Sequence, residues 1–202
     1  MKYELQFSVK PPLVGRSVER LRQLVIGRAH GECEFCGVKG FKKLSVVYGT
    51  DDLLVQSEYC AAACAVCYSI NTGGLYNEYP AGTFLYFPEL SQAELVGVFY
   101  SIEAWRQMAS SADRGTLNVI SAKINKRRGR IREMLGSHAV SVEHWNSLLS
   151  NNSKLNSNRS SLLSDFKFMP DKDVFADHLE MMKVGVFNQY NQRTLRVLGS
   201  RL

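Results

Sequence analysis

The chain has 202 residues, of which 45% are hydrophobic and 22% are charged, and this balance excludes wholesale disorder. It contains no apolar run near the ~20 residues of a membrane span, and residues 1–7 alternate between polar and apolar, unlike the apolar core of a signal peptide. A formal charge of +6 permits an acidic protein, a nucleic acid or an anionic membrane surface as partner and selects none of them.

The first part of the chain, about residues 1–90, is predicted to form a small module of strands and helices. In chain order, the patterns predict an edge strand over 3–9, a helix over 17–28, a strand over 44–48, a turn at 49–52, a continuing strand over 53–55, a short helix after Cys64 and a strand over 83–87. These alternating elements indicate an α+β module.

From about residue 91 the pattern becomes helical, and we expect 91–202 to be a helical region packed on the first module. Ser91 and Glu94 form a capping box that begins the first of these helices. Further helices are predicted over 117–135, over 141–149 and from Pro170 onward, whereas the polar run 150–161 is predicted to be a flexible loop. Strand 83–87 could join the two parts into one unit.

Five cysteines lie within 35 positions, and four of them form two C-x₂-C pairs, Cys33 with Cys36 and Cys64 with Cys67. Two such pairs supply the four thiolates of a tetrahedral structural zinc site. We expect a cytoplasmic protein, in which clustered cysteines bind metal rather than form disulfides. Cys60 is the spare thiol, although it could replace a ligand by pairing with Cys64.

The alternative interpretation, five ordinary buried cysteines, fits poorly with their clustering. Four thiolates leave no open coordination position for water, so the metal should stabilise the structure rather than catalyse a reaction.

A strand and turn between two cysteine pairs, with a helix after the second, resembles the ββα-metal fold of HNH nucleases. Those enzymes use a histidine base at the end of the strand that follows the first pair. Val47 or Tyr48 occupies that position here, and neither is a base at neutral pH, since valine cannot accept a proton and tyrosine has a pKa near ~10. The histidines lie elsewhere, at His30, His138, His144 and His178. We therefore expect an HNH-like frame without its catalytic histidine, and no enzyme.

A basic segment over 123–132 carries six Lys or Arg residues. On a helix, Ile124 and Ile131 would share one side and the cations would spread over the rest. Such a segment is often only the solvated face of an amphipathic helix. The alternatives are a docking surface for an acidic helix and a set of phosphate contacts.

Four segments in order carry a family resemblance: 5–11, 33–37, 64–67 and 82–95. The last is the most specific, because a strand followed by Pro-Glu-Leu-Ser-Gln and a capped helix is not a general zinc-finger pattern. Together they resemble the DotN/IcmJ family of type IVB (Dot/Icm) secretion systems, over about residues 1–110.

The resemblance implies a non-catalytic subunit of the type IV coupling complex, with an HNH-like zinc fold and Cys33, Cys36, Cys64 and Cys67 as zinc ligands. It implies binding to the C-terminal tail of the coupling ATPase, DotL, beside DotM and the IcmS–IcmW adaptors, and help in recruiting substrates. Such a subunit would be cytoplasmic, peripheral to the inner membrane through its complex, and without a small-molecule substrate. The alternative is a DNA-binding protein with a degenerate HNH fold; an active nuclease has the least support.

Overall fold

The computed structural model describes residues 16–48, 57–72, 82–108, 114–158, 161 and 163–182. The helices are α1 (Arg16–Ala29), α2 (Ala65–Asn71), α3 (Gln92–Met108), α4 (Arg114–Leu135), α5 (Val142–Ser150), α6 (Ser153–Ser157) and α8 (Ala176–Met182), with 3₁₀ turns η1 (Ser57–Tyr59) and η2 (Ser137–Val140). The strands are β1 (Ser45–Tyr48), β2 (Cys60–Ala63), β3 (Gly82–Tyr86) and β4 (Phe166–Pro170). Helices and antiparallel strand pairs are mixed, which confirms the α+β class.

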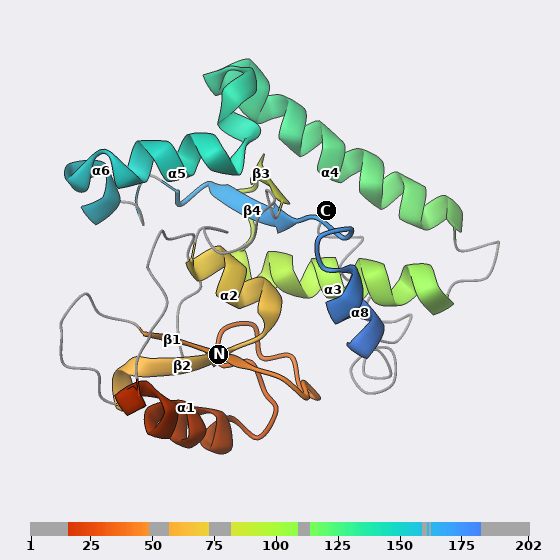
Figure 1. Cartoon of the computed structure of the whole chain (residues 1–202). Coiled ribbons are helices and arrows are strands. Elements are labelled where there is room, and N and C mark those ends of the chain that lie inside the picture. The colour runs from red at the N-terminus through yellow and green to blue at the C-terminus, as the bar shows by residue number, and fades with distance from the viewer. Residues whose placement is uncertain are drawn as a thin grey trace.

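At one end of the molecule, α1 packs on the strand pair β1–β2, and α2 follows β2 directly (Figure 1). The two strands are antiparallel, with Ser45 opposite Ala63. Helix α1 is amphipathic, since Val25 and Ala29 are buried whereas Arg22 and Gln23 are exposed. This end of the fold therefore places two strands and then a helix around the two cysteine pairs.

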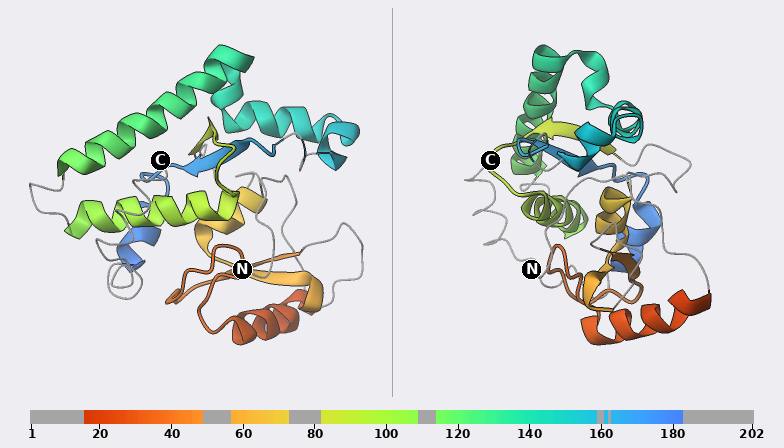
Figure 2. Two further views of the ribbon diagram at one scale, coloured as in Figure 1. Left: turned by 180° about the vertical axis from the view of Figure 1, so that it is seen from behind. Right: turned by 90° about the vertical axis from the view of Figure 1, so that its left-hand side faces the viewer.

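The second strand pair, β3–β4, lies between two long helices (Figures 1 and 2). Strand β3 contacts α4, and β4 contacts α3. Because helices cover both faces, the neighbouring residues Phe84 and Leu85 are both fully buried although they point to opposite sides. Gly82 begins the pairing, and a Cβ atom there would lie 2.1 Å from the carbonyl oxygen of Met169, so glycine is required.

Helix α3 is buried on both sides and contributes to two apolar clusters. The larger cluster, which includes the cysteines, takes Ala93, Val96, Phe99, Tyr100 and Ala104 from α3. The smaller cluster takes Leu95, Val98, Ile102 and Trp105 and joins α3 to β3 and α4. A helix that is apolar nearly all round is typical of a core position, and α3 is the wall that the two clusters share.

Most of the elements predicted from local patterns within the described residues are present. The helices expected over 17–28, 117–135 and 141–149 are α1, α4 and α5, and the strands expected over 44–48 and 83–87 are β1 and β3. The capping box is formed: the Ser91 N–H donates to Glu94 at 2.8 Å, and the Glu94 N–H donates to the Ser91 hydroxyl at 3.2 Å. The predicted elements at 3–9, 49–52 and 53–55 lie outside the described residues.

Two predictions for the second half are wrong. Helix α6 interrupts the predicted loop 150–161, because the Asn152 side chain accepts the Leu155 N–H at 3.0 Å and caps a helical turn whose Leu155 packs on the larger cluster. The helix predicted from Pro170 onward begins only at Ala176, as α8, because Pro170 is the last residue of strand β4 and pairs with Gly82 of β3. The β3–β4 pairing crosses the predicted boundary at residue 90, and the division into two domains stays a prediction.

Among the described segments, no helix combines the length and the apolar content that crossing a membrane requires.

Candidate metal centre

The structure brings the sulfur atoms of Cys33, Cys36, Cys64 and Cys67 within 4.8 Å of one another. A tetrahedral zinc ion with Zn–S bonds of about 2.3 Å would hold its sulfurs about 3.8 Å apart, which is compatible with this cluster. Three of the four residues are buried, and Cys36 is half-buried. The two cysteine pairs predicted from spacing thus meet at one point and form a possible metal-binding site.

The first pair lies in a tight turn between α1 and β1. The Gly37 N–H donates to the Cys33 carbonyl at 2.8 Å, and the Cys33 N–H donates to the Val38 carbonyl at 2.9 Å. Gly37 has φ of 72°, in the left-handed region that favours glycine. The Cys36-Gly37 step therefore closes the turn that aims both thiols inward.

The second pair lies at the start of α2. Cys64 is the N-cap residue, and its sulfur accepts the Cys67 N–H at 3.4 Å. The Cys64 N–H in turn donates to the Cys33 sulfur, also at 3.4 Å. Backbone donors at a helix start stabilise negative charge on sulfur and so offset part of the cost of burying a thiolate.

Glu34 fastens the first turn to strand β2. Its N–H donates to the Ala62 carbonyl at 2.9 Å, and its carboxylate accepts the Ala62 N–H at 2.8 Å. Arg28 lies 3.1 Å from the same carboxylate and also donates to the Cys60 carbonyl. The two cysteine pairs are therefore positioned by protein contacts as well as by any metal they hold.

A hydrogen-bonded chain from α3 and α8 reaches the cluster. The Tyr100 hydroxyl donates to the Cys64 sulfur at 3.2 Å, and the hydroxyl oxygen lies 3.0 Å from His178 Nε2. Phe41 stacks on the His178 ring, with centroids 5.6 Å apart. Burial raises the pKa of Tyr100, so its hydroxyl stays protonated and can donate to the sulfur. Burial lowers the pKa of His178 to about 4. The sequence analysis did not predict these hydrogen bonds, because no local spacing pattern indicates them.

The thiols in the cluster differ in their proton affinity. Burial raises the pKa of Cys64 and of Cys67, whereas hydrogen bonds from the other three cysteines lower the pKa of Cys33. Four thiolates in one buried place need a cation to offset their charge. The arrangement therefore fits a metal ion bound by all four sulfurs.

The remaining candidates from the sequence are not among the four clustered ligands. Cys60 of β2 is packed in the core and is not one of the clustered sulfurs. Burial raises the pKa of its thiol, which disfavours the reactive thiolate. His30 is exposed and follows the last residue of α1 with φ of 49°, a left-handed conformation that ends the helix. His138 and His144 belong to η2 and α5.

Compared with known proteins, the chain matches no family model and no curated protein. The geometry of the cysteine cluster is therefore the main indication of function.

Proposed function

We propose that the protein is a non-catalytic, zinc-stabilised interaction subunit of a type IVB coupling complex, of the DotN/IcmJ kind. The observation that carries this proposal is the cluster of four cysteine sulfurs. Four thiolates saturate a tetrahedral zinc ion and leave no position at which water could be activated. Such a centre stabilises a surface that binds other proteins.

The order of elements around the cluster supports an HNH-like frame without its chemistry. Strands β1 and β2 are followed directly by α2, and the cysteines come from the turn before β1 and the start of α2. In an HNH nuclease the base would stand near the end of the first strand, and Val47 and Tyr48 stand there in this chain. A frame of this kind would hold a structural metal and would lack the general base of the nucleases.

The proposed partner is the C-terminal tail of a DotL-like coupling ATPase, bound beside a DotM-like subunit and IcmS- and IcmW-like adaptors. Its support is the resemblance over about residues 1–110, which includes both cysteine pairs and the β3–α3 segment. Through this complex the subunit would lie at the inner membrane and help recruit substrates.

Metal analysis and co-purification test the proposal together. The purified chain should contain one zinc ion per molecule, and the ATPase tail should co-purify with it. Cys33→Ser should remove both zinc and tail binding, because metal-binding energy is also folding energy in such a site. Cys60→Ser is the matched control, since it removes a buried thiol outside the cluster and should leave both unchanged. A zinc-loaded chain that does not bind the tail would contradict the proposed partner but not the metal site.

The charge of α4 favours DNA binding as the second candidate function. This helix holds seven Arg or Lys residues against one Glu, so its formal charge equals the +6 of the whole chain. Phosphate contacts by these residues would give an affinity that falls steeply with salt. A DNA titration at low and high ionic strength tests this, and absence of binding at low ionic strength eliminates it.

A further inference from the structure

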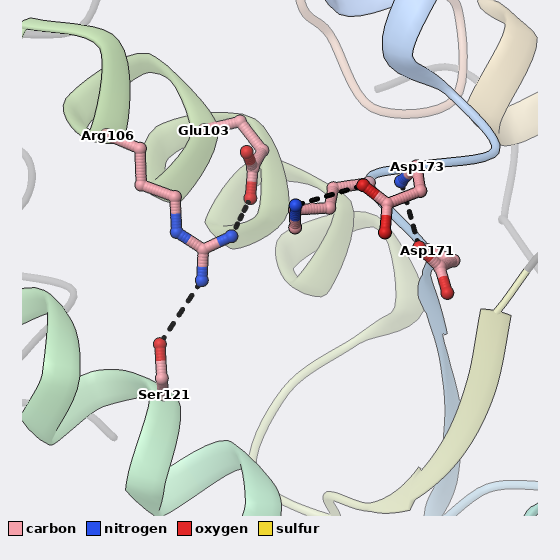
Figure 3. A network of polar contacts seen from close by, with 6 residues as sticks. Glu103, Arg106, Ser121, Asp171 and Asp173 are labelled. Atoms are coloured by element: carbon pink, nitrogen blue, oxygen red, sulfur yellow. Dashed lines mark hydrogen bonds and ion pairs between the residues drawn. The ribbon is translucent and has the colours of Figure 1, made fainter.

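A cleft lies between α3, α4 and the end of the β3–β4 pair, away from the cysteine cluster. Its volume is about 440 Å³, within the roughly 300–1,000 Å³ of small-molecule sites. Figure 3 shows the polar side of this cleft, where Arg106 reaches from α3 toward Ser121 of α4. Size alone does not identify a ligand, so the class of ligand must be inferred from the charged groups that line the cleft.

Most charged groups that line the cleft already have protein partners. Arg106 lies 2.7 Å from Glu103, whose side chain is 9% exposed, and donates to the Ser121 hydroxyl at 3.3 Å. Lys172 pairs with Asp173 at 2.9 Å, and the Asp173 N–H donates to the Asp171 carboxylate at 2.9 Å (Figure 3). Both acidic lining residues therefore have donors, and two of the three basic ones have acceptors.

Arg128 is the exception. It is half-buried and lines the cleft, and within the described segments it forms no hydrogen bond, ion pair or ring contact. Its neighbour Arg127 shows the usual outcome, since it pairs with Glu89 at 2.9 Å and covers the Phe87 ring at 4.7 Å. A partly desolvated guanidinium with five donors and no acceptor is a position where a carboxylate or phosphate would bind favourably.

The surroundings of Arg128 favour an anion with an apolar body. All the net charge of the chain lies on α4, which forms one wall and raises the local concentration of anions. On the same wall, the Asn125 amide can add a hydrogen bond beside the guanidinium. Ile124 and Met169 supply partly buried apolar surface in the lining.

We propose that this cleft binds a small organic anion, with its carboxylate or phosphate group on Arg128 and its apolar body against Ile124 and Met169. The inference goes beyond the proposed function, which requires no small molecule, and it departs from the expectation that the protein has no such ligand. It does not depend on the metal.

Titration of the full chain with phenyl phosphate and with benzoate tests the proposal. At least one of them should bind saturably at one site, and the tighter one identifies the anionic group. Inorganic phosphate and acetate, which have the same groups without the ring, should bind more weakly because they cannot use the apolar wall. Absence of saturable binding of both aromatic probes up to roughly millimolar concentration overturns the proposal.

Two charge-matched variants locate the site. Arg128→Gln should weaken binding of the better probe by roughly tenfold or more, the loss of a charged hydrogen bond. Arg132→Gln removes the same charge one helical turn away, from an exposed residue outside the lining, and should change the affinity little. An equal loss in both variants would show diffuse attraction to α4 and would overturn the assignment of Arg128. Circular dichroism checks that both variants are folded.

Discussion

The region around the cysteines and the region between α3 and α4 are stabilised in different ways. In the cysteine region (16–48 and 57–71), strand β2 buries only a cysteine and three alanines, and the larger cluster adds Phe35, Phe41 and Ile70 around the sulfurs. In the α3–α4 region (82–108 and 114–135), the smaller cluster buries large side chains such as Leu85, Phe87 and Trp105. The cysteine region therefore combines a hydrophobic cluster with a candidate metal site, whereas the α3–α4 region is stabilised by apolar packing.

Metal removal should separate the two regions most clearly. Cys64→Ser, or a strong chelator, should destabilise the cysteine region by about 10 kcal/mol or more, the usual contribution of a structural zinc site. Hydrogen exchange should then show lost protection in α1, β1, β2 and α2, while α3 and α4 keep theirs. Equal loss of protection in both regions would contradict the comparison.

A cavity in the α3–α4 region should lower stability without affecting the candidate metal site. Leu85 is fully buried in the smaller cluster, so Leu85→Ala should lower the free energy of unfolding by about 2–5 kcal/mol without reducing metal content. Urea denaturation and metal analysis measure the two effects. Leu135→Ala on α4 is the control, because Leu135 is 50% exposed and should contribute less than about 0.5 kcal/mol. Loss of metal from Leu85→Ala would show that the regions are not separable.

The sequence predicts the features of both regions that depend on neighbouring residues. The C-x₂-C spacing, the glycine after Cys36 and the capping box at Ser91 are local, and the structure contains each of them. Strand β2 was missed because Cys-Ala-Ala-Ala lacks the β-branched and aromatic residues that indicate a strand.

The features that were missed elsewhere depend on distant parts of the chain. Strand β4 forms because residue 170 pairs with residue 82. Tyr100 reaches Cys64, and His178 reaches Tyr100, only after α3 and α8 have packed. No periodicity within a single segment encodes such contacts. The sequence does not distinguish Arg128 from the other cations of its basic helix, because only the packed cleft makes it partly buried.

Acidification should lower the free energy of unfolding through His178, a residue by which α8 contacts the cysteine region. The pKa of His178 is about 4 in the fold because of burial, below its ordinary value of 6.5. The unfolded chain therefore binds this proton more readily, so His178 contributes stability above about pH 6.5 that is lost as the pH falls through about 4, up to about 3 kcal/mol.

The variant His178→Gln should remove this dependence. Between about pH 7 and about pH 4, the free energy of unfolding should fall more steeply in the original chain than in the variant. Protonation of the cysteines occurs in both proteins, so the difference between their slopes isolates His178. Parallel slopes would mean that the imidazole is not buried in a way that resists protonation.

Loss of the α3 cap should have the smallest effect and should be the only one shared by both regions. Ser91→Ala removes the hydroxyl that accepts the Glu94 N–H at 3.2 Å, which should cost about 1 kcal/mol. Because α3 contributes Val96 and Tyr100 to one cluster and Leu95 to the other, hydrogen exchange should increase slightly in both regions. Ser91→Thr keeps the hydroxyl and should restore most of the protection. An increase confined to the α3–α4 region would show that α3 supports only the hydrophobic cluster, and that the cysteine region is stabilised independently of the helix on which its Tyr100 lies.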